Sequence, residues 1–438
     1  MRPTDIEAIA ELLGEAAEAT GGVAEETHQA IAKRAFAATG RAARPVQAIH
    51  DAIAGFTYGS VRVGLKATFT QAGKLAARNV PVDAPALGDG IGDAVALGAL
   101  HGFVGDLLDE RGSALATPLS LRVGGRAVIP TRAFADLPAG DGAPEPSGAE
   151  VGAGEHPKAV ALAVAYPGAT PRLAVFLHGL CETEHAWRGL PKLGDRPRHT
   201  PFPDGLQADL GLTPLLIRFN SGRHISDNAR DLAVLLRGIV EHWPVPVTDV
   251  TLIGHSMGGL VARSAAWQDR DERWTGLVRH IVCLGTPHHG ADLEQGVHLL
   301  DWALGQTAET KAFSRLLRLR SSGIKDLRFG SATEEDWLDL DPDELVRRRA
   351  AEVPFLPHAE YCWVSATLTP GRVGHLLGDL LVRTPSASGT GKGHHVPFEV
   401  DNGATLHGLT HFDLLDHPAV YEQLVAWLSR PSRLPAPS

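Results

Sequence analysis

The stretch TLIGHSMGGLVA at residues 251–262 places a single serine, Ser256, between two glycines. The β-branched apolar run before it predicts a buried strand, and the run after it predicts a helix. A strand that turns into a helix within so few residues needs small neighbours, which Gly254 and Gly258 supply. Such a turn exposes a hydroxyl beside helix N–H groups that favour an oxyanion. The pattern predicts a nucleophilic serine; the alternative is a tight turn whose serine only caps the helix.

A serine hydroxyl is a weak nucleophile and needs a neighbouring base. The C-terminal stretch LHGLTHFDLLDHPAVY offers three histidines for that role: His407, His411 and His417. We favour His411, because it lies just before the final helical region and the apolar residues after it can anchor its loop. His407 is the main alternative, whereas His417 precedes a proline and fits the start of the helix.

The base in turn needs an acid that fixes its tautomer and stabilises the imidazolium. Asp379 is the favoured acid, because a charge inside the apolar run LLGDLLV needs a partner. Asp401 is the alternative, since it also precedes His411 in the chain. A surface aspartate without a catalytic role is the plainer reading of either residue.

Two backbone N–H groups are expected to hold the oxyanion. One belongs to Met257, directly after the serine, and the other to Leu180 in VFLHGLC, which follows a predicted buried strand. Gly179 in that stretch lets the backbone approach a substrate. Chemistry of this kind uses protein groups alone, so no cofactor and no metal are expected. Neither an HExxH motif nor paired CxxC motifs occur in the sequence.

Five motifs resemble, in their order, the α/β-hydrolase lipase and esterase family: HGL, GHSMGGLVAR, GTPHHG, GDLLV and HFDLL. They look closest to the triacylglycerol-lipase and GPI inositol-deacylase-like branch of that family. The similarity covers about residues 119 to 430. The stretch FNSGRHISDN at 219–228 also resembles this branch, and we expect its Arg223 and His224 to line the cleft or brace loops.

The resemblance implies a complete set of site residues, in the chain order serine, acid, histidine. The nucleophile would be Ser256, the acid Asp379 and the base His411, with an oxyanion hole at the N–H groups of Leu180 and Met257. Many relatives have a glycine after the acid, where this chain has Leu380.

The residues and the resemblance together predict a serine hydrolase that cleaves carboxylic esters through an acyl-enzyme. One alternative is an acyltransferase that uses the same groups, with an alcohol in place of water. Another is a catalytically silent module that binds lipid or a partner on the same fold. The expected substrate is a small-molecule ester with an apolar acyl chain.

Strands and helices must alternate to position these groups, and the sequence shows that alternation. Residues around Gly124 and Gly125 predict a hairpin. Helices are predicted from near Ser226 and from Pro418. Buried strands are predicted at residues 159–166, 172–179, 213–219, 247–253, 278–285 and 360–368. The expected fold class is α/β, the α/β-hydrolase fold, with a mostly parallel central sheet and helices on both faces.

Two further regions flank or interrupt this pattern. Residues 1–112 predict a helical N-terminal extension, and residues 113–438 the catalytic domain. From about 290 to 356 the strand signal vanishes, which predicts a helical cap over the sheet edge. Its apolar underside would consist of Trp302, Leu304, Phe313, Leu316 and Leu317. Such a cap would cover a site for apolar substrates; a helical insertion that merely packs is the alternative.

The composition of the 438 residues excludes some classes of protein. Hydrophobic residues make up 44% and the net charge is −10, which fits a soluble globular protein and argues against nucleic-acid binding. Three cysteines, expected as reduced thiols, cannot form a disulfide framework: Cys181, Cys283 and Cys362. The sequence shows neither a signal-like N-terminus nor about 18 consecutive apolar residues. We expect a cytoplasmic protein, with peripheral membrane contact left open.

Overall fold

The computed structural model describes residues 1–39, 44–131, 157–188, 200–291, 321–338, 351–371, 378–379, 381–390 and 396–430. The chain divides into two compact units. In the first unit, the described residues are 1–39, 44–89 and 108–116. The second unit holds the other described residues, including 90–107 and every predicted site residue. The boundary expected near residue 112 stays a prediction.

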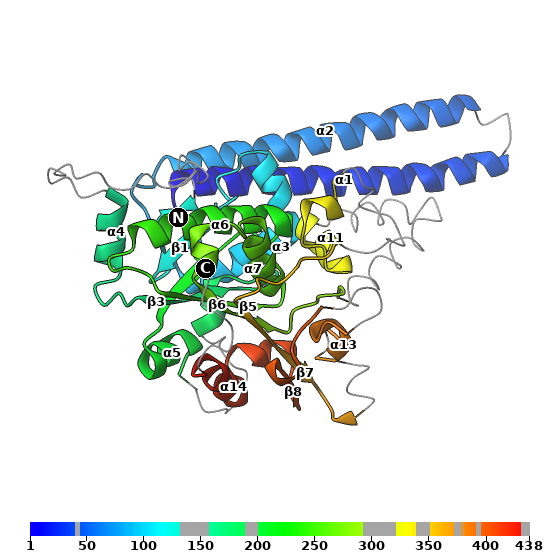
Figure 1. Ribbon diagram of the computed structural model, residues 1–438. Coiled ribbons are helices and arrows are strands. Elements are labelled where there is room, and N and C mark those ends of the chain that lie inside the picture. The colour runs from blue at the N-terminus through cyan, green and yellow to red at the C-terminus, as the bar shows by residue number, and fades with distance from the viewer. Residues whose placement is uncertain are drawn as a thin grey trace. The chain divides into compact units, whose positions relative to one another are not determined.

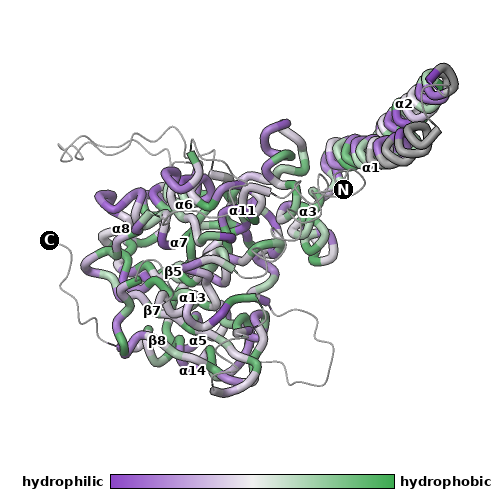
Figure 2. Tube along the Cα trace, turned by 90° about the vertical axis from the view of Figure 1, so that its right-hand side faces the viewer, coloured by the Kyte–Doolittle hydropathy of each residue, from purple (hydrophilic) through white to green (hydrophobic). Residues whose placement is uncertain are grey.

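In the first unit, two long helices, α1 (Pro3–Thr39) and α2 (Arg44–Ala77), run antiparallel side by side (Figure 1 and Figure 2). Small residues bring them close together: a Cβ added to Gly73 would lie 2.3 Å from the Cβ of Ala10. Ion pairs join the helices as well, with Arg62 Nη1 2.8 Å from Glu25 Oε2.

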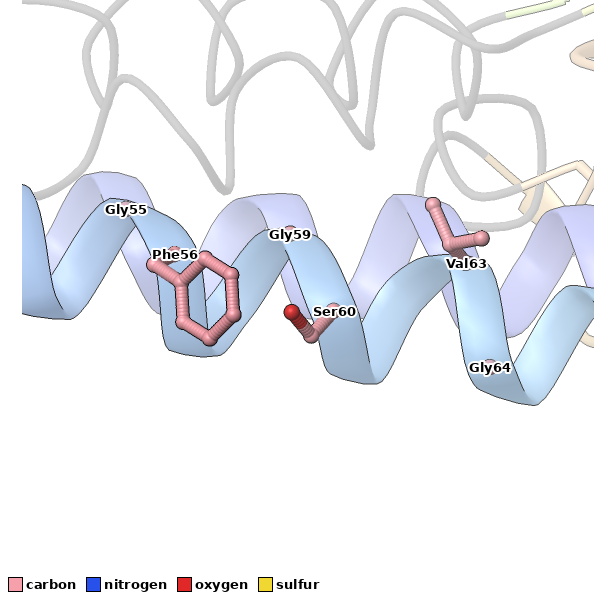
Figure 3. A pocket seen from close by; sticks show the side chains of 6 residues that line it. All are labelled: Gly55, Phe56, Gly59, Ser60, Val63 and Gly64. Carbon is pink, nitrogen blue, oxygen red and sulfur yellow. The ribbon is translucent and has the colours of Figure 1, made fainter.

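One face of α2 is apolar and is not covered by α1. Phe56 is 78% exposed and Val63 is 68% exposed, and both lie on the same side of the helix, with Ser60 between them (Figure 3). These residues line a depression of about 550 Å³ together with Gly55, Gly59 and Gly64. Among the described residues, nothing lies within 4 Å of a Cβ added at Gly59 or Gly64, so these residues leave the face uncovered.

Helix α3 (Ile91–Glu110) lies mainly in the second unit and is interrupted at Val104, where φ is −135° and ψ is 15°. Among the described helices, it alone is long and apolar enough to cross a membrane, judged by length and composition, and 39% of that window is buried. Its glycines allow close packing within the second unit. The Nδ2 of Asn220 donates a hydrogen bond to Gly105 O at 2.8 Å, so α3 is anchored to the loop after β4.

The second unit is built on an eight-stranded sheet in the order β2-β1-β4-β3-β5-β6-β7-β8. Its strands are β1 (Ser120–Val123), β2 (Arg126–Pro130), β3 (Arg172–Leu177), β4 (Thr213–Arg218), β5 (Asp249–His255), β6 (Val278–Leu284), β7 (Glu360–Thr367) and β8 (Gly403–His407). Neighbours from β4 to β8 pair in parallel, whereas β1 pairs antiparallel with β2 and β4. Gly124 and Gly125 both have positive φ, as a two-residue hairpin turn requires. The predicted mostly parallel sheet is confirmed.

Helices cover both faces of this sheet (Figure 1). They are α4 (Pro157–Ala165), α5 (Phe202–Leu210), α6 (Ile225–His242), α7 (Met257–Gln268), α8 (Arg273–Gly276), α11 (Ser322–Phe329), α13 (Thr384–Ala387) and α14 (Pro418–Leu428). Side chains alternate between the faces along each strand. On β3, Leu173 and Val175 enter the core that α6 and α7 cover. Phe176 enters the other core, with residues of α5 and α14.

Two secondary-structure predictions differ from the structure. Of residues 159–166, expected as a strand, residues 159–165 belong to helix α4, because alanines favour a helix and a short apolar run fits either form. One side of α4 is buried and the other is exposed: Leu162 is fully buried, whereas Val164 is 77% exposed. Strand β8 has no counterpart among the predictions. It is a five-residue edge strand, mostly half-buried, that begins at a glycine and lacks an apolar run.

The predicted cap is described only in part. Residues 321–338 form α11 and the 3₁₀ turn η4 (Glu334–Asp336). The five apolar residues assigned to the underside of the cap lie outside the described residues, as does Leu380. The three cysteines are free thiols, as expected. Cys283 is buried in β6 and Cys362 is buried in β7.

Candidate active site

Ser256 stands at the turn between β5 and α7, with φ of 52° and ψ of −120°. This is a strained conformation for a residue with a side chain, and such strain gathers at functional sites. The turn leaves no room beside it: a Cβ on Gly254 would lie 2.3 Å from Gly259 N, and one on Gly258 would lie 2.4 Å from Leu177 O. The predicted need for two glycines is therefore confirmed. Ser256 lies at the carboxyl end of β5, over the N-terminus of α7.

His411 and Asp379 come together from different loops. His411 begins the 3₁₀ turn η6 (His411–Leu415) after β8, and Asp379 lies in the loop after β7. The two side chains form a hydrogen bond of 2.7 Å between Nδ1 and Oδ2, and the His411 N–H donates to the Asp379 carbonyl at 3.2 Å. Both residues are buried. The carboxylate thus holds the imidazole with Nδ1 protonated and leaves Nε2 free to accept a proton.

The environment keeps Asp379 ionised. Burial alone would raise the pKa of its carboxyl, but the facing His411 outweighs this effect, and N–H groups of Val382 and Leu381 donate to Oδ1 at 2.8 and 3.0 Å. Together they hold the pKa below its usual value of 3.8. An ionised carboxylate at this position stabilises an imidazolium during catalysis.

The imidazole of His411 lies over Gly285, directly after β6. A Cβ on Gly285 would lie 3.0 Å from its Cε1 and 3.1 Å from its Nδ1. The neighbouring strand end holds Ser256, whose N–H donates to Leu284 O at 2.8 Å. Among the described residues, Ser256 Oγ and His411 Nε2 are not joined by a hydrogen bond. In ligand-free enzymes such a bond often tightens only when substrate binds.

The alternative residues lie elsewhere. His407 Nδ1 pairs with Thr367 Oγ1 at 2.7 Å at an exposed strand end, and His417 caps α14 by accepting from Ala419 N. Asp401 is exposed in the 3₁₀ turn η5 (Val400–Asn402). These positions bring neither His407 nor His417 to the Asp379 carboxylate, which is paired with His411.

Arg223 and His224 pair with residues of helices α6 and α11. Arg223 pairs with Asp231 at 2.5 Å. The His224 ring stacks on Trp337 at 3.8 Å between centroids, and its Nδ1 lies 3.1 Å from Asp326 Oδ2 in α11. These contacts fit the expected bracing role.

The loop from His178 to Thr183 lies between β3 and the 3₁₀ turn η3 (Glu184–Arg188) and approaches Ser256; we call it the β3–η3 loop. A Cβ on Gly179 would lie 3.1 Å from Ser256 Cβ, so glycine here lets the loop approach the serine without a tight contact. Leu180 follows at the surface of the core, and Cys181 has a φ of 60°. Within the described part of the chain, the N–H groups of Leu180 and Met257 have no hydrogen-bond acceptor. Two such donors beside a serine are suited to bind an oxyanion.

Three polar residues of the site were absent from the sequence predictions. His178 is fully buried; its Nδ1 donates to Gly179 O at 2.9 Å and its Nε2 accepts from Phe219 N at 3.2 Å. Burial lowers the pKa of His178, in keeping with a neutral ring in this tautomer. The other two, Glu182 and His255, pair with each other. The sequence could have pointed to His178 and His255, because a polar side chain at the end of a buried strand needs a hydrogen-bond partner.

Helix α3 packs on the outer side of the β3–η3 loop. A Cβ on Gly98 would lie 2.9 Å from the carbonyl oxygens of both Cys181 and Glu182. At Gly102 a Cβ would lie 2.1 Å from Cys181 Sγ. The last helix of the predicted helical extension, α3, thus packs against the loop that carries Leu180.

The structural arrangement agrees with a comparison to known families. Residues 217–333, from β4 through the serine turn to α11, match the family model of the PGAP1-like alpha/beta domain. The fold is that of the α/β-hydrolases. The family resemblance predicted from the motifs is confirmed by this match and by the sheet order. No curated protein matches the chain in sequence.

Several solved structures are similar to this chain at low identity. The mature form of Bacillus licheniformis lipase BlEst2 is 19% identical, with a TM-score of 0.38, over 59% of this chain and 92% of the lipase. Aspergillus fumigatus lipase B is 12% identical, with a TM-score of 0.38, over 67% and 64%. A thermophilic esterase from Thermogutta terrifontis is 11% identical, with a TM-score of 0.35, over 59% and 89%. With TM-scores below 0.5, these likenesses decide no function.

Proposed function

We propose that this α/β-hydrolase cleaves carboxylic esters by acyl transfer to Ser256, with His411 as the base and Asp379 as the acid. The observation that carries the proposal is the hydrogen bond of 2.7 Å between His411 Nδ1 and Asp379 Oδ2, at the same sheet edge as the strained serine turn. A buried carboxylate that orients an imidazole beside a serine is the arrangement that serine acyl transfer needs.

The reaction follows from these positions. Ser256 Oγ attacks the ester carbonyl while its proton passes to His411 Nε2, and the N–H groups of Leu180 and Met257 hold the oxyanion. The tetrahedral intermediate collapses as His411 gives that proton to the leaving alcohol. A water then attacks the acyl-enzyme, its proton passes to His411, and collapse releases the carboxylic acid and restores the Ser256 hydroxyl.

A fluorophosphonate probe tests the nucleophile directly. It is expected to label Ser256 stoichiometrically and to abolish hydrolysis of p-nitrophenyl esters in the same proportion, because both need an activated serine. Peptide mapping locates the label. Labelling without hydrolysis but with ester formation from added alcohol would establish acyl transfer. Absence of both labelling and turnover would contradict the proposal and leave a binding module.

The ester acyl chain sets a second expected result. Half-buried Leu180 and exposed Phe412 flank the catalytic positions and offer apolar contact. Each substrate methylene buried against such contacts gains about 0.8 kcal/mol, or about fourfold in kcat/KM. We therefore expect kcat/KM to rise stepwise from acetyl esters through short and medium chains. A flat profile would remove an apolar acyl site from the proposal, and a peak only on emulsified triolein would indicate a preference for lipid aggregates.

The contact of α3 with the β3–η3 loop gives a third expected result. Gly98→Ala forces a Cβ against the carbonyl oxygens of Cys181 and Glu182. The displaced loop is expected to lower kcat by about 10- to 100-fold, because small shifts of oxyanion donors are costly. Gly92→Ala is the matched control on the same helix, since no described residue lies within 4 Å of a Cβ added there. Steady-state kinetics measures kcat for both variants. Equal losses of kcat in Gly98→Ala and Gly92→Ala would contradict a role for α3 in positioning the loop.

A further inference from the structure

One carboxylate oxygen joins two parts of the site. Oε2 of Glu182, in the β3–η3 loop, accepts the Gly179 N–H at 2.6 Å and lies 3.0 Å from Nδ1 of His255. His255 is the last residue of β5, directly before Ser256. The side chain of Glu182 is only 9% exposed and that of His255 is fully buried. The contact therefore ties the loop that carries Leu180 to the serine turn.

The second ring nitrogen of His255 extends this connection to His411. Its Nε2 lies 3.2 Å from the backbone oxygen of His411. A carbonyl oxygen only accepts, so Nε2 must carry a hydrogen. Nδ1 faces an oxygen that already accepts from Gly179, which favours a hydrogen on Nδ1 as well. With both nitrogens as donors, His255 is an imidazolium and Glu182 is its carboxylate partner.

The surrounding charges are consistent with this ionised pair. Burial alone would lower the pKa of His255, but the facing Glu182 carboxylate outweighs it and raises the pKa above 6.5. For Glu182, burial would raise the pKa, but His255 and the Gly179 N–H hold it below 4.5. The other ionisable groups acting on the pair are His178, Asp379 and His411, whose ring centroid lies 4.7 Å from that of His255. Asp379 also favours the cation.

We propose that Glu182 and His255 form a buried carboxylate–imidazolium pair that positions the β3–η3 loop and His411 around Ser256. This inference rests on the proposed ester hydrolysis. Neither side chain reaches the reacting atoms, so both are positioning residues. Their loss should alter the alignment of the base and the oxyanion donors, which act on the transition state, more than the binding of the substrate.

Glu182→Gln tests the charge at nearly constant shape. The single oxygen Oε2 serves two donors, and an amide can present either an oxygen or a nitrogen there. Without the carboxylate, His255 is expected to lose a proton, so one of the three contacts to Gly179, Glu182 and His411 must break. We expect kcat to fall about 10- to 100-fold while KM changes by less than about threefold.

A matched control separates positioning from general stability. Asp326, a buried carboxylate, forms another carboxylate–histidine pair at 3.1 Å with the half-buried His224. Asp326→Asn is expected to lower Tm and to leave kcat of the folded protein unchanged. Equal losses of kcat in Glu182→Gln and Asp326→Asn, in proportion to their losses of Tm, would overturn the positioning role.

Nitrogen NMR of the histidine rings tests the pair independently of activity. In ¹⁵N-labelled wild-type protein near neutral pH, both ring nitrogens of His255 are expected to be protonated, with His255→Gln providing the assignment. In Glu182→Gln the ring should carry a single proton. A singly protonated His255 in the wild type would overturn the ion pair.

The two proposals fail in different ways. If the wild-type protein hydrolyses esters and Glu182→Gln keeps its kcat, the positioning role is wrong and the proposed function stands. If the wild type hydrolyses no ester, the proposed function is wrong, and with it the positioning role. The NMR experiment still decides whether the ion pair exists.

Discussion

Ser256→Ala is expected to lower kcat for p-nitrophenyl esters by roughly 10⁴- to 10⁶-fold, because the variant lacks the atom that attacks the carbonyl. The fold should persist. The change removes one oxygen that makes no hydrogen bond to any described residue, and the strained backbone at φ of 52° is the same for either side chain. Measurement of kcat and Tm on the same preparation checks both expectations. Residual turnover from the oxyanion donors would remain measurable.

Ser264→Ala is the matched control for this variant. Ser264 is fully buried in the same helix, α7, and its hydroxyl donates to Ala332 O. Loss of the Ser264 hydroxyl should lower Tm, since the buried carbonyl oxygen of Ala332 loses its donor. The kcat should stay close to the wild-type value. A Ser256→Ala variant with near-normal kcat would contradict the proposed mechanism as a whole.

The sequence predicts those parts of the fold in which local pattern and packing agree. The strand and helix around Ser256 could be predicted because Gly254 and Gly258 stand where a tight turn leaves no room for a Cβ. Helix α4 was predicted wrongly, because its apolar run of alanine and valine fits a strand or a helix, and its contacts decide between them. The sequence does not predict strand β8. This strand is stabilised by its pairing with β7, and a local sequence pattern does not reveal such a pairing.

The candidate site shows the same division. His411 and Asp379 were favoured for reasons that apply to each residue alone: an anchored loop, and a charge within an apolar run. The structure joins them by a hydrogen bond. The contact of Glu182 with His255 spans 73 residues of sequence and depends on how the β3–η3 loop folds back to β5. No spacing in the sequence predicts a contact of that kind.

The expected effect of Asp379→Asn sets the two candidate acids apart. An amide in place of the carboxylate cannot stabilise the imidazolium and can donate to Nδ1, which favours the tautomer with its proton on Nε2. We expect kcat to fall by about 10³- to 10⁴-fold. Asp401→Asn is the control, because Asp401 is exposed in η5, and its kcat should stay within about twofold of wild type. The reverse order of the two effects would make Asp401 the acid.

The same pair of variants predicts a difference in pH dependence of stability. The pKa of Asp379 is lowered in the folded protein, so its ionised form stabilises the fold above the ordinary value of 3.8. That contribution is lost as the pH falls through the folded pKa. Asp379→Asn lacks it, so the difference in Tm from wild type should be largest near neutral pH and shrink on acidification. Asp401→Asn should show no such trend. A constant difference in Tm for Asp379→Asn would mean that the carboxylate does not pair with His411 in solution.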